Sequence, residues 1–153
     1  MGGVRLRCRR GDTSVEFLVL FPVLIGAVFL GVALAMAALA RAEVSVAARA
    51  GARVAAIECG QGTAAWASDA QTAVVDELQQ GGLHLVTEVP NPTQAGDWYV
   101  GTYCSSFGQA GGVAAVQVQY AALNLFPQFG SLFGGTGGAG AWSLNEVASF
   151  PTE

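Results

Sequence analysis

Residues 17–40 form an uninterrupted apolar run, and this run constrains the chain more than any other feature. It holds no charged or strongly polar side chain over 24 residues, and 14 of these are Leu, Ile, Val or Phe. As an α-helix rising about 1.5 Å per residue, it would be roughly 36 Å long, enough to cross a hydrocarbon core of about 30 Å with some tilt. The apolar side chains favour insertion by about 4–8 kcal/mol. The sequence therefore predicts one transmembrane helix near the N-terminus.

The basic residues predict how this helix is oriented. All seven are arginines, and four of them lie within the six residues 5–10, just before the run. Three follow it, at positions 41, 49 and 53. The positive-inside rule then places the N-terminus in the cytoplasm and the C-terminal region outside the cytoplasmic membrane. No Lys or Arg follows Arg53, whereas acidic residues do, which excludes attraction to nucleic acid. The acidic residues of that region are Glu58, Asp69, Asp76, Glu77, Glu88, Asp97, Glu146 and Glu153.

Three kinds of N-terminal segment have a basic head followed by an apolar run. A secretory signal peptide has a shorter run, about 7–15 residues, although Ala38-Leu39-Ala40 would serve as its cleavage site. An uncut signal anchor fits both length and charge. A prepilin-type leader is cut before the run, and its marks are a short basic leader, a Gly, and a Glu at the fifth residue after the cut. Here Gly11 and Asp12 would flank the cut and Glu16 is in register, which favours the prepilin interpretation.

Glu16 has a physical reason to be in that position. Cleavage would leave a charged α-amino group beside lipid, where an unpaired charge is costly. A carboxylate one helical turn further on can pair with it, in the same chain or in a neighbouring subunit. The alternative is a capping box, with Thr13 as N-cap and Glu16 reaching back to it, which requires neither cleavage nor partners.

The helix is predicted to continue beyond the membrane, from about Thr13 to Glu58. Residues 41–57 contain no Pro and are rich in Ala, the best helix former. One side of this segment carries small residues, Gly51 among them, that permit close packing on a sheet or helix. Within the apolar run, Pro22 and the Gly26/Gly31 pair are candidate bends, and Ala27 with Gly31 forms a small-xxx-small pair suited to helix–helix contact.

This N-terminal segment resembles TadE-like proteins of the tight-adherence pilus assembly system. The shared features are Arg9-Arg10-Gly11, Val15-Glu16-Phe17, Pro22, and the downstream segment from Ala48 to Arg53. The resemblance implies a minor pilin (pseudopilin) that is processed by a prepilin peptidase and helps assemble Flp-type pili at the cytoplasmic membrane. Its implied partners are other pilins or pseudopilins and the pilus assembly machinery. It also implies an α+β fold like that of type IV pilins. Asp12 departs from the usual pattern, since pilins generally have an apolar or small residue after the cut.

The rest of the chain is predicted to form a small α+β domain, so that three parts follow one another: a leader (1–11), a long helix (12–58) and an extracytoplasmic domain (59–153). A second helix is expected at 63–80, with Thr63 as N-cap, Gly81-Gly82 as the stop and Trp66, Ala70, Ala73, Val74 and Leu78 on its buried side. Strands of a short antiparallel sheet are expected at 83–89, 113–120 and 141–150. Residues 99–105 are either a strand or a loop.

The cysteines permit one disulfide. Cys8 lies among the leader arginines and is expected to stay reduced, whereas Cys59 and Cys104 both follow the apolar run, where a disulfide could persist. The sequence leaves open whether these two form a bond or are two buried thiols.

Nothing in the sequence indicates catalysis. No GxSxG, HExxH or Walker pattern occurs, the glycine-rich segment 134–140 lacks the lysine of a phosphate loop, and His84 is the single histidine. We therefore expect no enzyme, cofactor, metal site or small-molecule substrate. Phe126, Phe129 and Phe133 either pack on the sheet or form an exposed apolar patch.

Two classes of function remain. The chain is either an assembly protein whose apolar helix joins a bundle of like helices in or below a pilus, or an uncleaved, membrane-tethered envelope protein that binds another partner.

Overall fold

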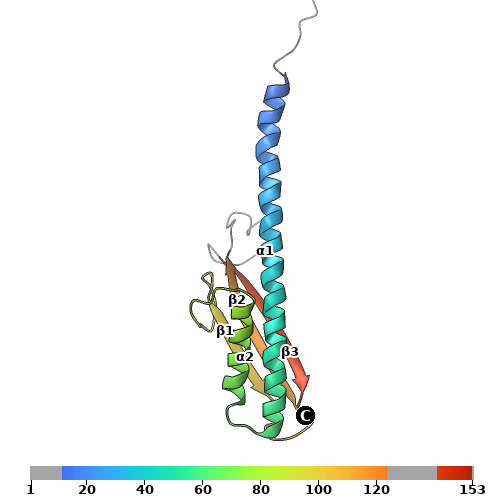
Figure 1. Ribbon diagram of the computed structural model, residues 1–153, viewed down its shortest axis with the longest axis vertical. Helices are drawn as coiled ribbons and strands as arrows, with labels where there is room; N and C mark the ends of the chain where they lie inside the picture. Colours follow the sequence, from blue (N-terminus) through green and yellow to red (C-terminus); the bar gives the residue numbers. More distant parts are fainter. Residues whose placement is uncertain (1–11, 124–140, 153) are drawn as a thin grey trace, which may run out of the picture. The chain divides into compact units, whose positions relative to one another are not determined.

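The computed structural model describes residues 12–123 and 141–152. The chain divides after Ala35 into two compact units, and we describe each by itself. Of the described residues, the first unit contains the beginning of helix α1 (Asp12–Gln61). The second contains the rest of α1, helix α2 (Trp66–Gln80) and three strands (Figure 1). We call the described residues from Met36 onward the α+β unit.

The predicted long helix α1 is confirmed, and it ends three residues later than expected, at Gln61. Its end has a specific cause. Gly62 adopts a φ of 70°, which only glycine reaches at no cost, and the Thr63 N–H turns back to the Glu58 carbonyl at 3.0 Å. The Gly62 N–H bonds to the Cys59 carbonyl at 3.1 Å, which completes a Schellman motif.

Helix α2 begins later than predicted, and the prediction of Thr63 as its N-cap is wrong. The N-cap is Ala65, which makes no side-chain cap. The backbone of Thr63 is committed to closing α1, and its carbonyl accepts the Trp66 N–H at 3.2 Å. The predicted stop is confirmed, because Gly82 has a φ of 79° and ends the helix in a second Schellman motif. Of the predicted inner side, Ala70, Val74 and Leu78 are buried, whereas Trp66 and Ala73 are half-buried.

The sheet is three-stranded and antiparallel, in the order β1 (Trp98–Cys104), β2 (Val113–Leu123), β3 (Ala141–Pro151). The strands predicted at 113–120 and 141–150 are confirmed, and the segment at 99–105 is a strand. Residues of β2 alternate between buried and half-buried from Ala114 to Tyr120, so that one face of the sheet is turned to the helices.

The strand predicted at residues 83–89 is wrong. This segment follows the edge of β1 in the parallel direction and forms only one bridge, between Glu88 and Trp98. Pro90 and Pro92 follow immediately and supply no N–H to extend the ladder. The alternation in the sequence therefore belongs to a segment that lies beside the sheet without joining it as a strand.

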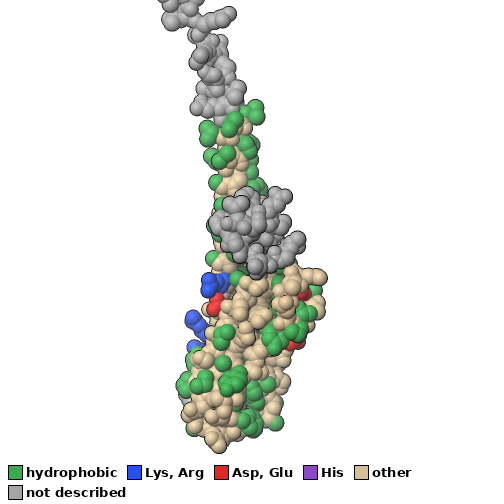
Figure 2. Space-filling model, turned by 180° about the vertical axis from the view of Figure 1, so that it is seen from behind, with side chains coloured by type: hydrophobic (Ala, Val, Ile, Leu, Met, Phe, Trp, Pro, Cys, Tyr) green, Lys and Arg blue, Asp and Glu red, His purple; other side chains and the backbone are tan. Residues whose placement is uncertain are grey.

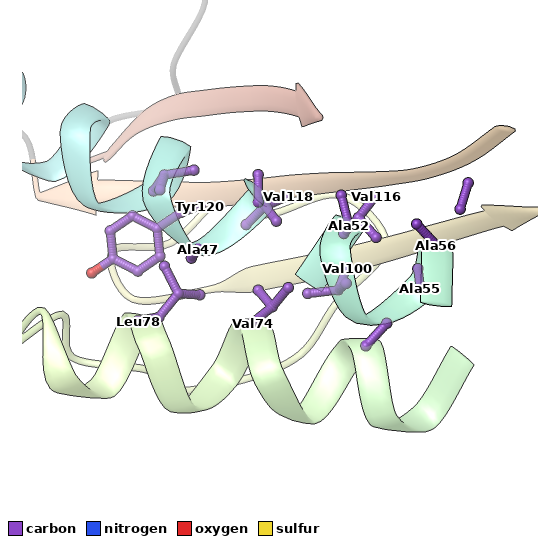
Figure 3. Packing of buried hydrophobic residues seen from close by; sticks show 14 of the residues in the cluster. Ala47, Ala52, Ala55, Ala56, Val74, Leu78, Val100, Val116, Val118 and Tyr120 are labelled. Carbon is purple, nitrogen blue, oxygen red and sulfur yellow. The ribbon is translucent and has the colours of Figure 1, made fainter. Parts of the chain in front are cut away.

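The core of the α+β unit lies between the two helices and one face of the sheet (Figures 1 and 3). Its tightest point is Gly51 on α1. A Cβ atom at this position would collide with Val74 Cγ2 of α2 and lie 3.0 Å from the Ala70 carbonyl oxygen and 3.6 Å from Val116 of β2. The small-residue side of α1 thus brings its backbone against both α2 and the sheet. Its buried members include Val44, Ala47, Ala48, Ala52, Ala55, Ala56 and Cys59.

Two arginines fasten the other side of α1 to β3. Arg41 donates to Glu146 at 2.8 Å, and the Arg53 guanidinium lies 5.9 Å from the centre of the Phe150 ring. The Arg41 side chain is 72 % exposed, so this ion pair contributes about 1 kcal/mol or less. The ion pair therefore adds little to the stability of the sheet.

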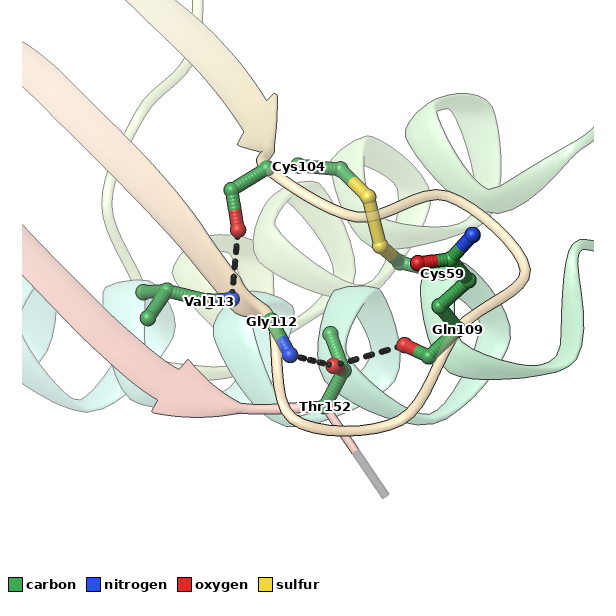
Figure 4. Close-up of a disulfide and its surroundings, with 7 residues drawn as sticks. Cys59, Cys104, Gln109, Gly112, Val113 and Thr152 are labelled. Atoms are coloured by element: carbon green, nitrogen blue, oxygen red, sulfur yellow. Dashed lines mark hydrogen bonds between the residues drawn. A yellow bond between two sulfur atoms is a disulfide. The ribbon is translucent and has the colours of Figure 1, made fainter.

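A disulfide between Cys59 and Cys104 joins the end of α1 to the end of β1, across a sequence separation of 45 (Figure 4). The following loop is held to the same place, because the Gly108 N–H bonds to the Cys59 carbonyl at 2.8 Å. Thr152 closes the arrangement from the other side of the loop. Its buried Oγ1 accepts the Gly112 N–H at 2.7 Å and donates to the Gln109 carbonyl at 3.1 Å.

Glu58, near the end of α1, carries a partly buried carboxyl group. Its Oε2 is buried and has no hydrogen-bond partner among the described residues. Desolvation raises the pKa of Glu58, and the neighbouring carboxyl group of Asp69 raises it further, because repulsion and the contact between the two groups both favour the protonated form. The folded state therefore binds this proton more tightly than the unfolded state.

We expect Glu58→Gln to stabilise the protein at pH 7 and to make little difference at pH 4. A raised pKa in the folded state contributes stability below the unfolded value of 4.5, and this contribution is lost as the pH rises through the folded pKa. An amide keeps a donor for Asp69 and never ionises. Melting temperatures from circular dichroism at both pH values test this, with Glu77→Gln on α2 as the control. An equal effect of Glu58→Gln at both pH values would contradict it.

Candidate functional site: the apolar half of helix α1

The beginning of α1 exposes its apolar side chains on every side. All residues from Phe17 to Phe29 are exposed, including Leu18 at 75 % and Leu24 at 64 %. Figure 2 shows apolar side chains over the described surface of this segment. Such an apolar surface is not stable in water and needs a bilayer or other apolar helices around it.

Within the described residues, α1 is the one helix long and apolar enough to cross a membrane. The contrast along α1 is sharp, because the same helix buries small residues from Val44 to Cys59 in the core of the α+β unit. One continuous helix therefore serves two environments, and the change from one to the other falls near the end of the uncharged run, at residues 36–43.

The predicted processing site lies at the beginning of this helix. Gly11 is outside the described residues, Asp12 is the first residue of α1, and Glu16 lies one turn further along the same helix. The rise between Asp12 and Glu16 along such a helix is about 6 Å. The pairing of a new α-amino group with the Glu16 carboxylate stays a prediction. The described helix already includes Thr13, whereas a capping box would require Thr13 to precede the helix.

The predicted helix-packing residues fall into two groups. Pro22, Ala27 and Gly31 lie on the exposed segment, and a Cβ atom at Gly31 would meet nothing within 4 Å. Gly51 instead is already packed within the chain. A contact between Gly31 and a second helix stays a prediction.

The remaining candidates have simple outcomes. Among the residues that the structure describes, no three metal-ligating side chains form a group that could hold a metal ion. His84 is exposed. The predicted patch of Phe126, Phe129 and Phe133 lies outside the described residues. The sequence did not indicate that Glu43 lies beside Gly81. The two residues are far apart in the chain, and no local motif marks such a contact.

These features define a class of protein: a single apolar helix suited to anchoring in a membrane, continued into a small α+β unit. The comparison with protein families then identifies the N-terminal segment, because residues 11–53 match the family model described as TadE-like protein. The resemblance noted in the sequence is thereby confirmed over that segment, and it associates the chain with the Tad pilus. The TadE-like family is a structural family and not a family of enzymes. No match was found among curated proteins or solved structures.

Proposed function

We propose that the protein is a minor pilin, or pseudopilin, of Flp-type (tight-adherence) pili. One observation carries this proposal: the TadE-like match at residues 11–53 begins at Gly11 and coincides with the exposed apolar helix and its continuation. A prepilin peptidase would cut between Gly11 and Asp12. The helix would then stay in the cytoplasmic membrane with its N-terminus inside and the α+β unit outside, as the arginine distribution favours.

Assembly would use the same helix. Glu16 would neutralise the new α-amino group, within the chain or between subunits, because two opposite charges cost less in an apolar environment than one alone. The other pilins would cover the apolar surface from Phe17 to Phe29, with close approach at Ala27 and Gly31. Pilus assembly would thus depend on this helix, while the α+β unit sets what the subunit presents outside.

We expect the mature chain isolated from its native membrane to begin at Asp12. Replacing Gly11 with Leu should block the cut, because the peptidase would have to accept a bulky side chain at the cleavage position. N-terminal sequencing and intact mass measure the result, and Gly3→Leu, which changes the leader elsewhere, is the matched control. A wild-type chain that begins at Met1 would support the tethered envelope protein, and one that begins at Arg41 would mean a secreted protein.

The Glu16→Gln variant separates processing from assembly. It should still enter the membrane, since it loses only one charge at the edge of the run, but pilus yield should fall. Ser14→Ala changes a neighbouring polar side chain and should leave the yield unaltered. Unchanged pilus yield in Glu16→Gln would contradict the proposed pairing.

A further inference from the structure

The α+β unit contains a groove of about 430 Å³ between α1, the end of α2 and β2. One wall comes from α1 and belongs to the last residues of the uncharged run, where Met36 is 58 % and Leu39 61 % exposed. The opposite wall comes from the segment that follows α2 and from β2. The residues around the groove are chiefly Met36, Leu39, Glu43, Gly81, Leu83 and His84.

The polar end of the groove carries the side chain of Glu43. The Glu43 carboxylate lies over Gly81, where a Cβ atom would be 2.6 Å from Glu43 Oε2. Gly81 is the C-cap of α2, so the carboxylate adds to the negative end of that helix dipole. Within the described parts of the chain, Glu43 makes no hydrogen bond or ion pair, and the nearby Arg41 is bound to Glu146 instead. The surroundings of Glu43 are therefore electronegative, and no basic side chain of the described residues is bound to it.

His84 supplies the complementary group. Its backbone carbonyl accepts the Tyr120 hydroxyl at 3.3 Å, which fixes the backbone at the rim of the groove. Its imidazole is exposed and has no hydrogen-bond partner among the described residues. An imidazole N–H can donate to a phosphate oxygen. The groove thus offers an apolar wall, an acceptor for a cation and a donor for an anion.

We propose that this groove binds a phosphatidylethanolamine lipid. The primary ammonium donates to Glu43, the phosphate accepts from His84, and an acyl chain lies along Met36 and Leu39. An anionic lipid would place a second negative charge beside Glu43, and a quaternary choline has no N–H to donate.

This inference rests on the proposed function only for the membrane anchoring of α1. Residues 36–40 end the uncharged run, so the groove wall lies at the level of the headgroups if that run spans the bilayer. Lipid is then the most concentrated amphiphile available to it.

The test uses the full chain in nanodiscs made from equal parts of phosphatidylethanolamine, phosphatidylcholine and phosphatidylglycerol. The protein is released gently from the nanodiscs, and native mass spectrometry counts the lipid molecules that stay bound to it. We expect phosphatidylethanolamine to be enriched about tenfold, the order expected for one charge-assisted hydrogen bond. Glu43→Gln should abolish the enrichment. Gly81→Ala should reduce it, because the new methyl group displaces the carboxylate while the φ of −67° suits alanine.

The matched control is Asp76→Asn, which removes one exposed acidic charge from α2 and should keep the enrichment. Thermal unfolding of each variant checks that the α+β unit is intact. Equal retention of all three lipids, or the same loss in Asp76→Asn, overturns the inference. Dimers that retain no lipid would mean that a second copy occupies the groove, and this also overturns it. A chain that does not enter the discs defeats the membrane anchoring itself, whereas incorporation without selectivity defeats only the lipid site.

Discussion

Replacing Cys59 and Cys104 together with alanine should lower the free energy of unfolding by roughly 4 kcal/mol. The bond closes a loop with a separation of 45 residues, and in the chain-entropy model such a loop restricts the unfolded chain by about this amount. A loss of this size is comparable to the whole stability of many small domains. Urea unfolding of the full chain in detergent, followed by tryptophan fluorescence, measures it.

Without the disulfide, we expect the structure to loosen first around the end of α1 and the loop attached to it. The disulfide holds the end of α1 near the loop that also bonds to Cys59 through Gly108. Without it, hydrogen exchange should rise first at Gly108 and Gly112. Cys8→Ser is the matched control, because this cysteine lies in the leader and outside the pair. If the double variant and the wild type had equal free energies of unfolding in the absence of a reducing agent, a stabilising disulfide would be contradicted.

Replacing Gly51 with valine should destabilise the α+β unit by about 3 kcal/mol, the upper range for overpacking a core. The reason is that Gly51 lies against Val74 and the Ala70 backbone, and a carbonyl oxygen at 3.0 Å cannot move without shifting α2. Valine favours a helix more than glycine does, but this gain is well under about 1 kcal/mol and does not offset the loss from overpacking. Thermal unfolding by circular dichroism in detergent gives the measurement.

Gly31→Val is the matched substitution on the same helix. A Cβ atom there meets nothing within 4 Å, so the variant should unfold at the wild-type temperature. In the pilus, however, it should weaken assembly if another helix approaches at that position. Equal melting temperatures for the two variants would contradict the close packing of α1 on α2.

The sequence predicted the long helix and the strands β2 and β3 because their patterns are local. A charge-free run, an alanine-rich continuation and an alternating strand each carry their own signal. Residues 83–89 also alternate, but their outcome depends on Pro90 and on a parallel neighbour, Trp98, that becomes adjacent only in the fold. Thr63 is not the N-cap of α2 because its backbone N–H bonds to the Glu58 carbonyl and so belongs to the end of α1.

The candidate site was predictable only in part, for the same reason. Glu16 and the apolar run follow one another in the chain, so their spacing could be recognised directly. Glu43 and Gly81 come from different helices, and neither residue has a motif of its own. The disulfide was predictable in part. The sequence showed that Cys59 and Cys104 were the two cysteines that could pair, but it could not show that the fold brings their Cα atoms to 6.4 Å from each other.

The position of Thr152 sets an order of events for folding. Strand β3 and Thr152 are encoded after everything they pack on, and Thr152 ties the loop that follows the disulfide. If the α+β unit lies outside the membrane, its sheet cannot close until residue 152 has been exported. The chain must therefore cross the membrane open, and a partly translocated molecule has an unpaired β2 edge that a chaperone of the envelope would have to shield.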